Sequence, residues 1–136
     1  MIAILDASVA VKWFAPDGDA TDAVAVRVLR DVVGHPGRFV VPELFFYEML
    51  AVLCRRMRQA RDVHAALGRL SRLGLRRVRQ DDRLLRRAVR LAYRYRLTGY
   101  DASYVALAAE VGGVWLTFDV AAHGRVAQLG VARIPV

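Results

Sequence analysis

The chain has 136 residues, of which 56% are hydrophobic and one is cysteine, and its formal net charge is +8. This length and composition suit one domain with a substantial core, and they exclude a disordered chain or an internal disulfide framework. No apolar run reaches the roughly eighteen residues of a membrane span. We therefore expect a single domain over residues 1–136 that is cytoplasmic and free of the membrane. The charge is almost all arginine and points to an anionic partner, although genome base composition also favours arginine over lysine.

The first fourteen residues predict a strand, a carboxylate and a helix in immediate succession. Residues 2–5 form a short apolar run, which is typical of a strand buried on both faces of a parallel sheet. Asp6 follows directly, and residues 7–11 begin a helix that Pro16 and Gly18 end. In open α/β sheets, functional groups gather beyond the carboxyl ends of the strands. Asp6 is therefore either a helix N-cap or part of a site, and other carboxylates must decide between the two.

The rest of the chain alternates between helical and extended patterns. We expect helices over residues 20–33, 43–57, 62–73, 82–95, 100–111 and 119–129, and strands over residues 39–41, 75–78, 114–118 and 131–134. This alternation predicts an α/β fold with a mainly parallel sheet.

The helix over residues 43–57 is apolar nearly all round, which indicates burial in the core or in an interface. Cys54 falls in this pattern, so we expect a buried, inert thiol. Glu48 lies inside the same helix. An unpaired buried carboxylate costs several kcal/mol or becomes neutral, so Glu48 needs a cationic partner. That partner is either a divalent cation or an arginine.

The helix over residues 82–95 divides into an arginine face and an apolar face. The basic residues at i, i+3, i+4, i+7 and i+11 are Arg83, Arg86, Arg87, Arg90 and Arg94, which we call the arginine stripe. Because like charges at these spacings repel, the stripe is either a solvated surface or a site for an anion such as RNA.

Two further carboxylates resemble Asp6 in their position. Asp119 follows the strand expected at residues 114–118, and Asp101 lies at the start of a helix, where Thr98 and Asp101 have the spacing of a capping box. Together with Glu48 these acids could form an all-oxygen site of the kind that Mg²⁺ and Mn²⁺ prefer. Carboxylates that hold a metal inside a basic protein are the arrangement that a metal-dependent nuclease needs.

Other chemistries fit the sequence less well. His35, His64 and His123 lack metal-ligand spacing, no glycine-rich phosphate loop is present, and Ser8 has no evident base. A haloacid-dehalogenase-like phosphatase also begins with an Asp after its first strand, but it needs a second Asp two residues later, where this chain has Ser8.

The ordered motifs resemble those of PIN-domain ribonucleases, and most of all the VapC-type toxins of toxin–antitoxin pairs. The matching residues are Asp6-Ala7-Ser8-Val9, Lys12-Trp13-Phe14, Pro42, Glu48, Tyr100-Asp101-Ala102 and Leu116-Thr117-Phe118-Asp119. They cover essentially the whole chain. One departure is Ala51, where relatives often have Asn.

This resemblance implies a single PIN domain, an α/β/α sandwich that cleaves RNA internally as the toxin of a type II pair. Asp6, Glu48, Asp101 and Asp119 would be the catalytic acids that bind Mg²⁺ or Mn²⁺, and the hydroxyls of Ser8 and Thr117 would support them. The family also implies a homodimer and a VapB-like antitoxin gripped by the helices between Glu43 and Leu73.

The alternative is a catalytically inactive PIN-fold module that binds RNA or a protein. Four intact acids argue against it, because clustered carboxylates without a function destabilise one another.

Overall fold

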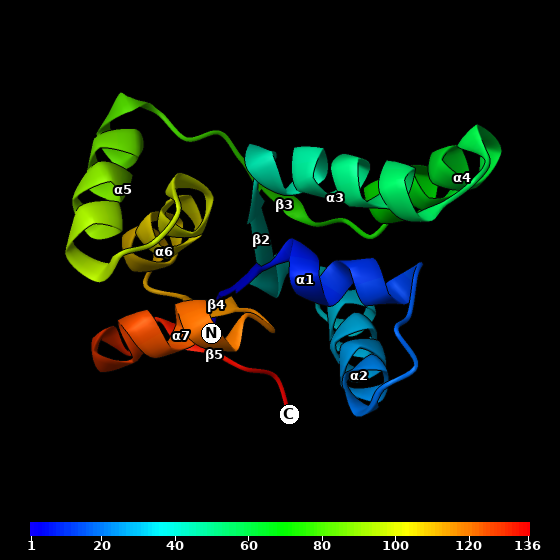
Figure 1. Ribbon diagram of the computed structural model, residues 1–136, viewed down its shortest axis with the longest axis horizontal. Coiled ribbons are helices and arrows are strands. Elements are labelled where there is room, and N and C mark those ends of the chain that lie inside the picture. Colours follow the sequence, from blue (N-terminus) through cyan, green and yellow to red (C-terminus); the bar gives the residue numbers. More distant parts are fainter.

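The computed structural model describes residues 1–136 and has a central sheet with helices on both faces (Figure 1). The strands are β1 (Ala3–Leu5), β2 (Phe39–Pro42), β3 (Arg76–Val78), β4 (Val114–Leu116) and β5 (Ala132–Arg133). The α-helices are α1 (Ala7–Ala10), α2 (Ala20–Gly34), α3 (Glu43–Arg56), α4 (Ala60–Ser71), α5 (Asp82–Tyr95), α6 (Gly99–Val111) and α7 (Val120–Val126). Short 3₁₀ turns are η1 (Val11–Trp13), η2 (Pro36–Arg38) and η3 (Ala127–Leu129).

The sheet has the strand order β3-β2-β1-β4-β5, and every neighbouring pair is parallel. This confirms the α/β fold with a parallel sheet that the alternation predicts. The chain reverses its direction across the sheet between β1 and β4, which is the point where open α/β sheets form their crevice. The register pairs Leu5 with Leu116, so the residues that follow these two strands begin side by side.

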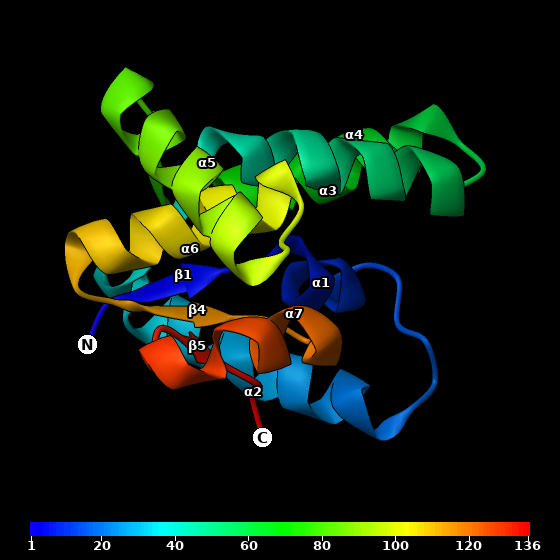
Figure 2. The same cartoon turned by 60° about the vertical axis from the view of Figure 1, so that its left-hand side comes forward.

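Two sets of helices cover the sheet because the connections first run outward to β3 and then return to β4. Figure 1 shows α1 to α4 on one side of the strands and α5 to α7 on the other. Helix α6 packs against β1, β2 and β4, and α5 packs on the outside of α6. Figure 2 shows β1, β4 and β5 in sequence beside one another, with α7 next to β5.

The core forms where the two central strands meet the helix faces. Ile4, Leu5 and Trp115 of β1 and β4 are completely buried, as are Phe45 of α3 and Tyr104 of α6. The apolar runs of the sequence therefore become the inner strands, as expected for a parallel sheet covered on both faces. No helix combines the length and the apolar character that crossing a bilayer requires.

Helix α3 is not buried all round. Phe45, Met49 and Leu53 face the core, whereas Tyr47 and Leu50 are exposed. Cys54 is also exposed, so the prediction of a buried thiol is wrong. The apolar pattern of this helix serves the core on one side only, and its other side is apolar surface.

Candidate active site

Asp6 is a buried carboxylate at the carboxyl end of β1. Its Oδ2 accepts hydrogen bonds from the Ser8 backbone N–H at 3.1 Å and from the Thr117 hydroxyl at 3.2 Å. Its Oδ1 accepts one from the Trp115 indole N–H at 3.2 Å. The bond to Ser8 caps α1. Asp6 therefore caps a helix and also lines a pocket, so the two interpretations of the sequence are compatible.

Asp119 and Asp101 reach the same pocket from two other elements. Asp119 follows β4 and caps α7 by accepting from the Ala122 N–H at 2.9 Å. For α6 the cap is Thr98, whose hydroxyl accepts from the Asp101 N–H at 3.0 Å. The Thr98 backbone N–H donates no hydrogen bond to the Asp101 carboxylate, so the expected capping box is only half formed. This carboxylate lines the pocket.

Glu48 projects from the middle of α3 and is half-buried. Its Oε1 accepts a hydrogen bond of 2.7 Å from the hydroxyl of Tyr104. No arginine or lysine forms an ion pair with Glu48. The sequence allowed either a divalent cation or an arginine as the partner of Glu48, and the structure contains no arginine partner.

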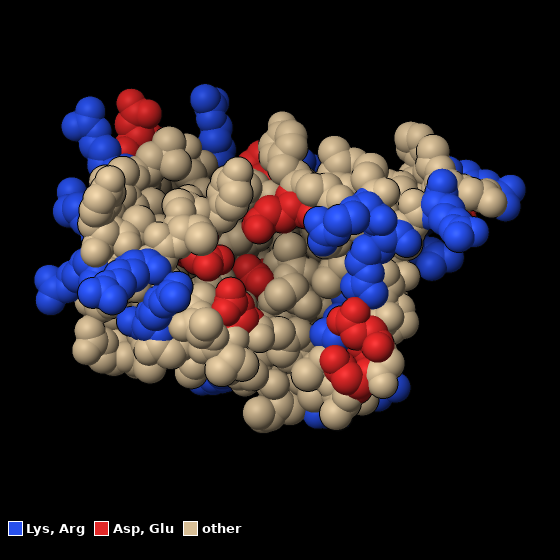
Figure 3. All heavy atoms as spheres, viewed as in Figure 1, with Lys and Arg blue, Asp and Glu red and all other residues tan.

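These carboxylates open into one cavity of about 380 Å³. Its lining comprises Asp6, Ala7, Ser8, Val11, Glu48, Ala51, Val52, Arg55, Asp101 and Asp119. In Figure 3, acidic side chains lie in a hollow at the centre of one face, and basic side chains lie on both sides of that hollow. Four acids that are far apart in the sequence thus share one pocket.

Burial and mutual repulsion make this pocket electrostatically unfavourable without a counter-charge. Burial raises the pKa of Asp6, even though its hydrogen bonds act to lower it. Burial, together with the nearby charges of Asp6 and Asp101, raises the pKa of Glu48 to about 6. Burial and the charges of Asp6 and Asp119 likewise raise the pKa of Asp101 to about 6. With pKa values of about 6, Glu48 and Asp101 are mostly ionised at neutral pH, and neither carboxylate forms an ion pair.

The donor set fits a hard divalent cation. All side-chain donors of the pocket other than Arg55 are oxygen atoms, and raised pKa values of this kind are relieved when a cation binds. No group of three or more His, Cys, Asp or Glu side chains is arranged in the structure so that it could hold a metal ion.

The hydroxyls of Ser8 and Thr117 connect two of the acids. The Thr117 hydroxyl donates to Asp6 and accepts from the Asp119 N–H at 3.0 Å. The Ser8 hydroxyl lies 3.4 Å from that of Thr117 and accepts from the Phe118 N–H at 3.0 Å. Both hydroxyls thus lie between the residues that follow β1 and those that follow β4.

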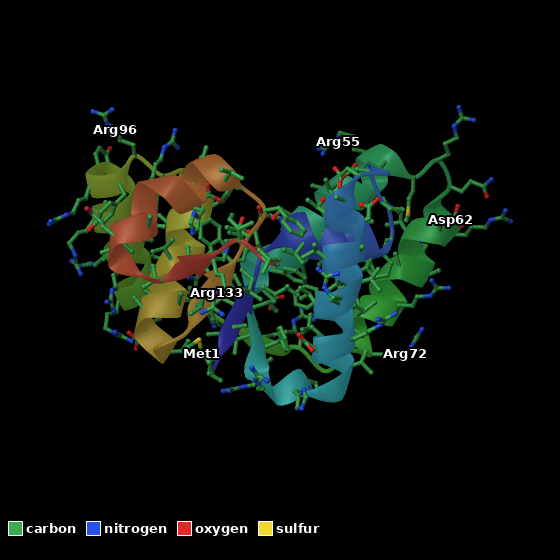
Figure 4. All side chains as sticks on the ribbon, turned by 90° about the horizontal axis from the view of Figure 1, so that it is seen from below. Met1, Arg55, Asp62, Arg72, Arg96 and Arg133 are labelled. Carbon is green, nitrogen blue, oxygen red and sulfur yellow. The ribbon has the colours of Figure 1, made fainter.

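Sequence reasoning missed three residues of this region. The Tyr104 hydroxyl donates to Glu48, and the Trp115 indole N–H donates to Asp6. Arg55 lines the pocket from the end of α3. Figure 4 labels Arg55 on the side of the molecule that also carries Asp62 and Arg72. Arg55 lies seven residues, or two helical turns, after Glu48, so this spacing was the available signal.

The arginine stripe lies on α5, outside α6, and none of its members lines the acidic pocket. Arg83 and Arg87 form ion pairs with Glu110 of α6. Glu110 therefore relieves part of the repulsion within the stripe. The other three, which include Arg86 and Arg90, have no ion-pair partner in the chain.

A second acidic cluster surrounds Lys12, the only lysine. The buried ammonium lies 2.7 Å from Asp17, 3.1 Å from Asp22 and 3.4 Å from Asp19. Burial acts to lower the pKa of Lys12, but its hydrogen bonds to Asp17 and Asp22 outweigh this and raise the pKa. Lys12, together with Arg56 on Asp17, offsets most of the charge of this cluster, so it is not a candidate metal centre.

The chain matches a known protein family in sequence and known proteins in fold. A family model described as PIN domain matches residues 3–128. No curated protein sequence matches the chain significantly.

Solved structures resemble the chain over nearly its whole length. The VapC20 toxin of Mycobacterium tuberculosis, described as cleaving the sarcin–ricin loop, has a TM-score of 0.75 and 18% identity over 98% of this chain and 99% of that one. A toxin–antitoxin complex from Klebsiella pneumoniae has a TM-score of 0.74 and 16% identity over 98% of each chain. PAE2754 of Pyrobaculum aerophilum has a TM-score of 0.67 and 24% identity over 92% of this chain and 84% of that one.

Replacing Glu48 by Gln should stabilise the metal-free protein at pH 7.5. The pKa of Glu48 is raised in the folded state, so its contribution to stability is present below about pH 4.5 and lost as the pH rises through about 6. We expect Glu48→Gln to raise the free energy of unfolding at pH 7.5 by about 1 kcal/mol, a value reduced for solvent screening of a half-buried group. Urea unfolding with chelator measures it.

The matched control is Glu43→Gln on the same helix, where the lost ion pair with Arg77 should give no stabilisation. Equal stability of Glu48→Gln and the parent at pH 7.5 would show that the Glu48 charge is already compensated.

Proposed function

We propose that this chain, which belongs to the PIN domain family, is a Mg²⁺- or Mn²⁺-dependent endoribonuclease that acts as the toxin of a type II toxin–antitoxin pair. One observation carries the enzymatic part of this proposal. Asp6, Glu48, Asp101 and Asp119 come from four elements, line one pocket and find no basic partner within the chain. An uncompensated acidic pocket at the crevice of an α/β sheet suits a metal-dependent phosphodiesterase.

The chain's own groups divide the work of hydrolysis. Asp6, Glu48, Asp101 and Asp119 would hold the cation, and Ser8 and Thr117 keep Asp6 and Asp119 in place. A bound divalent cation polarises phosphoryl oxygens and makes a bound water more acidic. The guanidinium of Arg55, at the edge of the pocket, is placed to contact the phosphate, because arginine binds phosphate oxygens in a bidentate manner.

RNA binding is supported by the charge of the surface around the pocket. The acidic centre of the face in Figure 3 is flanked by arginines, and the net charge is +8. We propose that Arg83, Arg86, Arg87, Arg90 and Arg94 contact the RNA backbone beyond the cleavage site. Arg86 and Arg90 are the clearest candidates because neither pairs with an acid of the chain.

An antitoxin partner is supported by a structural neighbour that is itself a toxin–antitoxin complex. The surface offers a place for an apolar segment of such a partner. Two hollows of about 350 and 270 Å³ share Trp13, Phe14 and Arg69, and they lie where η1 meets α2 and α4. Part of this surface belongs to the helices between Glu43 and Leu73 that the resemblance predicts. Co-purification with the product of an adjacent reading frame tests the pairing.

A homodimer is supported by apolar surface on α5. Leu85, Val89 and Tyr93 follow one another at four-residue intervals and are 46%, 56% and 88% exposed. They border a hollow of about 550 Å³ that Leu97 and Ser103 complete. A projecting tyrosine beside an apolar hollow is self-complementary, as a two-fold interface requires. We propose that a second copy of this chain covers this face.

Replacing Asp101 by Asn should abolish RNA cleavage and leave RNA binding intact. The substitution removes one charge from the cation site, and outer partners of metal ligands alone are worth 10–100-fold, so we expect cleavage to fall by more than about 100-fold. Cleavage of a mixed RNA pool with Mg²⁺, with Mn²⁺ and with chelator measures it.

The control is Asp62→Asn, which alters an exposed acid of α4 outside the pocket and is purified identically. Equal cleavage by the parent and Asp101→Asn would indicate a contaminating nuclease or a wrong site. Binding of the same RNA without any metal-dependent cleavage by the parent would favour the inactive module.

Replacing both Arg86 and Arg90 by Ala should weaken RNA binding and reduce its salt dependence. Each lost phosphate contact lowers the slope of log K against log salt by about 0.7 for a single strand. The slope is measured by titrating RNA at several salt concentrations with protein that carries both arginine substitutions and with protein that does not. Both proteins also carry Asp101→Asn, so that the RNA is not cleaved during the titration. The control pair is Arg27 and Arg30, two exposed arginines of α2. An unchanged slope would make the stripe a solvated surface.

Replacing Val89 by Glu should convert the proposed dimer into monomers, because two carboxylates would be buried at the two-fold axis. Light scattering after gel filtration measures the mass. Val26→Glu, on the partly exposed face of α2, should leave the dimer intact. A dimer that survives Val89→Glu must use another face.

A further inference from the structure

A stacked aromatic pair lies beneath the acidic pocket. Tyr104 comes from α6 and Trp115 from β4, and both side chains are completely buried. Their ring centroids are 5.8 Å apart and the ring planes differ by 20°. Neither residue lines the pocket itself, so neither can contact a substrate there.

Each ring directs its one polar atom at one carboxylate of the pocket. The Tyr104 hydroxyl donates to Glu48 Oε1 at 2.7 Å, and the Trp115 indole N–H donates to Asp6 Oδ1 at 3.2 Å. The core needs only the apolar volume of these rings, which at position 104 phenylalanine would provide as well as tyrosine. Buried tyrosine and tryptophan need a partner for their polar atoms, and here both partners are acids of the same site.

These bonds determine which carboxylate oxygens remain available. Asp6 Oδ2 already accepts from Ser8 and Thr117, so both of its lone pairs are used. Asp6 Oδ1 accepts only from Trp115 and keeps one lone pair. Glu48 uses Oε1 for Tyr104 and keeps Oε2 entirely free.

We propose that Tyr104 and Trp115 are a coupled pair of positioning residues that present Asp6 Oδ1 and Glu48 Oε2 to a divalent cation. The pair holds two carboxylates from different elements at a fixed separation. The pair also prevents the Glu48 side chain from turning along α3 towards Arg55. Arg55 is the one basic residue of the pocket lining. This inference rests on the proposed function in one respect, namely that the acidic pocket binds a divalent cation.

The experiment compares Tyr104→Phe and Trp115→Phe with the parent in Mn²⁺ binding by calorimetry. Each substitution keeps an aromatic ring and removes one donor. Since outer partners of metal ligands are typically worth 10–100-fold in affinity, we expect each variant to bind Mn²⁺ about 10-fold more weakly or worse. Because the rings stack, the double variant should lose less than the product of the two single effects.

Tyr95→Phe is the matched control, because it removes a tyrosine hydroxyl from α5, outside the lining of the pocket. It should leave Mn²⁺ affinity unchanged. Urea unfolding with chelator verifies that each variant folds. Tyr104→Phe removes a single oxygen atom and so tests the pair even where Trp115→Phe loses stability through its smaller ring.

RNA cleavage at increasing Mn²⁺ separates positioning from general damage. Variants with weakened positioning should need more Mn²⁺ for half-maximal cleavage and recover the parental rate when Mn²⁺ is saturating. Parental Mn²⁺ affinity in both folded variants would overturn the positioning role while leaving the nuclease proposal standing. Failure of the parent itself to bind Mn²⁺ would overturn the metal site, and the positioning role with it.

Discussion

The structure is organised around the cost of keeping several carboxylates together with no basic partner. Asp6 is buried at the carboxyl end of the central strand, and the charges of Asp6 and Asp101 act on Glu48. Neutral hydrogen-bond donors of α1, of α6, and of β4 with the residue that follows it offset this cost only in part. Neutral donors orient a carboxylate but leave its charge in place. The pocket is therefore pre-organised in geometry and incomplete in charge, which is the condition in which a cation binds best.

The ion pairs of the chain lie outside this pocket. Glu43 pairs with Arg77, Glu110 pairs with Arg83, and Lys12 with Arg56 offsets most of the charge of Asp17, Asp19 and Asp22. The acids without an ion pair outside the pocket are Asp31, Asp62, Asp81 and Asp82, whereas the pocket gathers four such acids in one cavity. A chain with a large excess of arginine could have placed one against Glu48, yet Arg55 is the only basic side chain in the pocket lining. The acidic pocket is thus an exception within a basic protein.

Much of this was predictable from the sequence, because local patterns specify local structure. Apolar runs and helix signals predicted the succession of strands and helices along the chain, and Glu48 was recognisable as an acid inside an apolar helix. Burial on a given helix face was less predictable: Cys54 follows the apolar pattern of α3 but faces solvent. The sequence did not identify Tyr104 and Trp115 as residues of this region, for a different reason. Both have the composition of ordinary core residues, and their role depends on tertiary contacts with Glu48 and Asp6.

The strand order has a consequence for how the molecule is made. The central strand β1 leaves the ribosome before the other strands of the sheet, and its neighbour β4 follows more than a hundred residues later in the chain. Until β4 emerges, Asp6 lacks the donors of Trp115 and Thr117, and Asp119 has not yet been synthesised. Contacts between such distant segments also form slowly. A nascent chain therefore carries its first acids without the strand that assembles them, and the pocket becomes complete only after β4 and Asp119 have been synthesised.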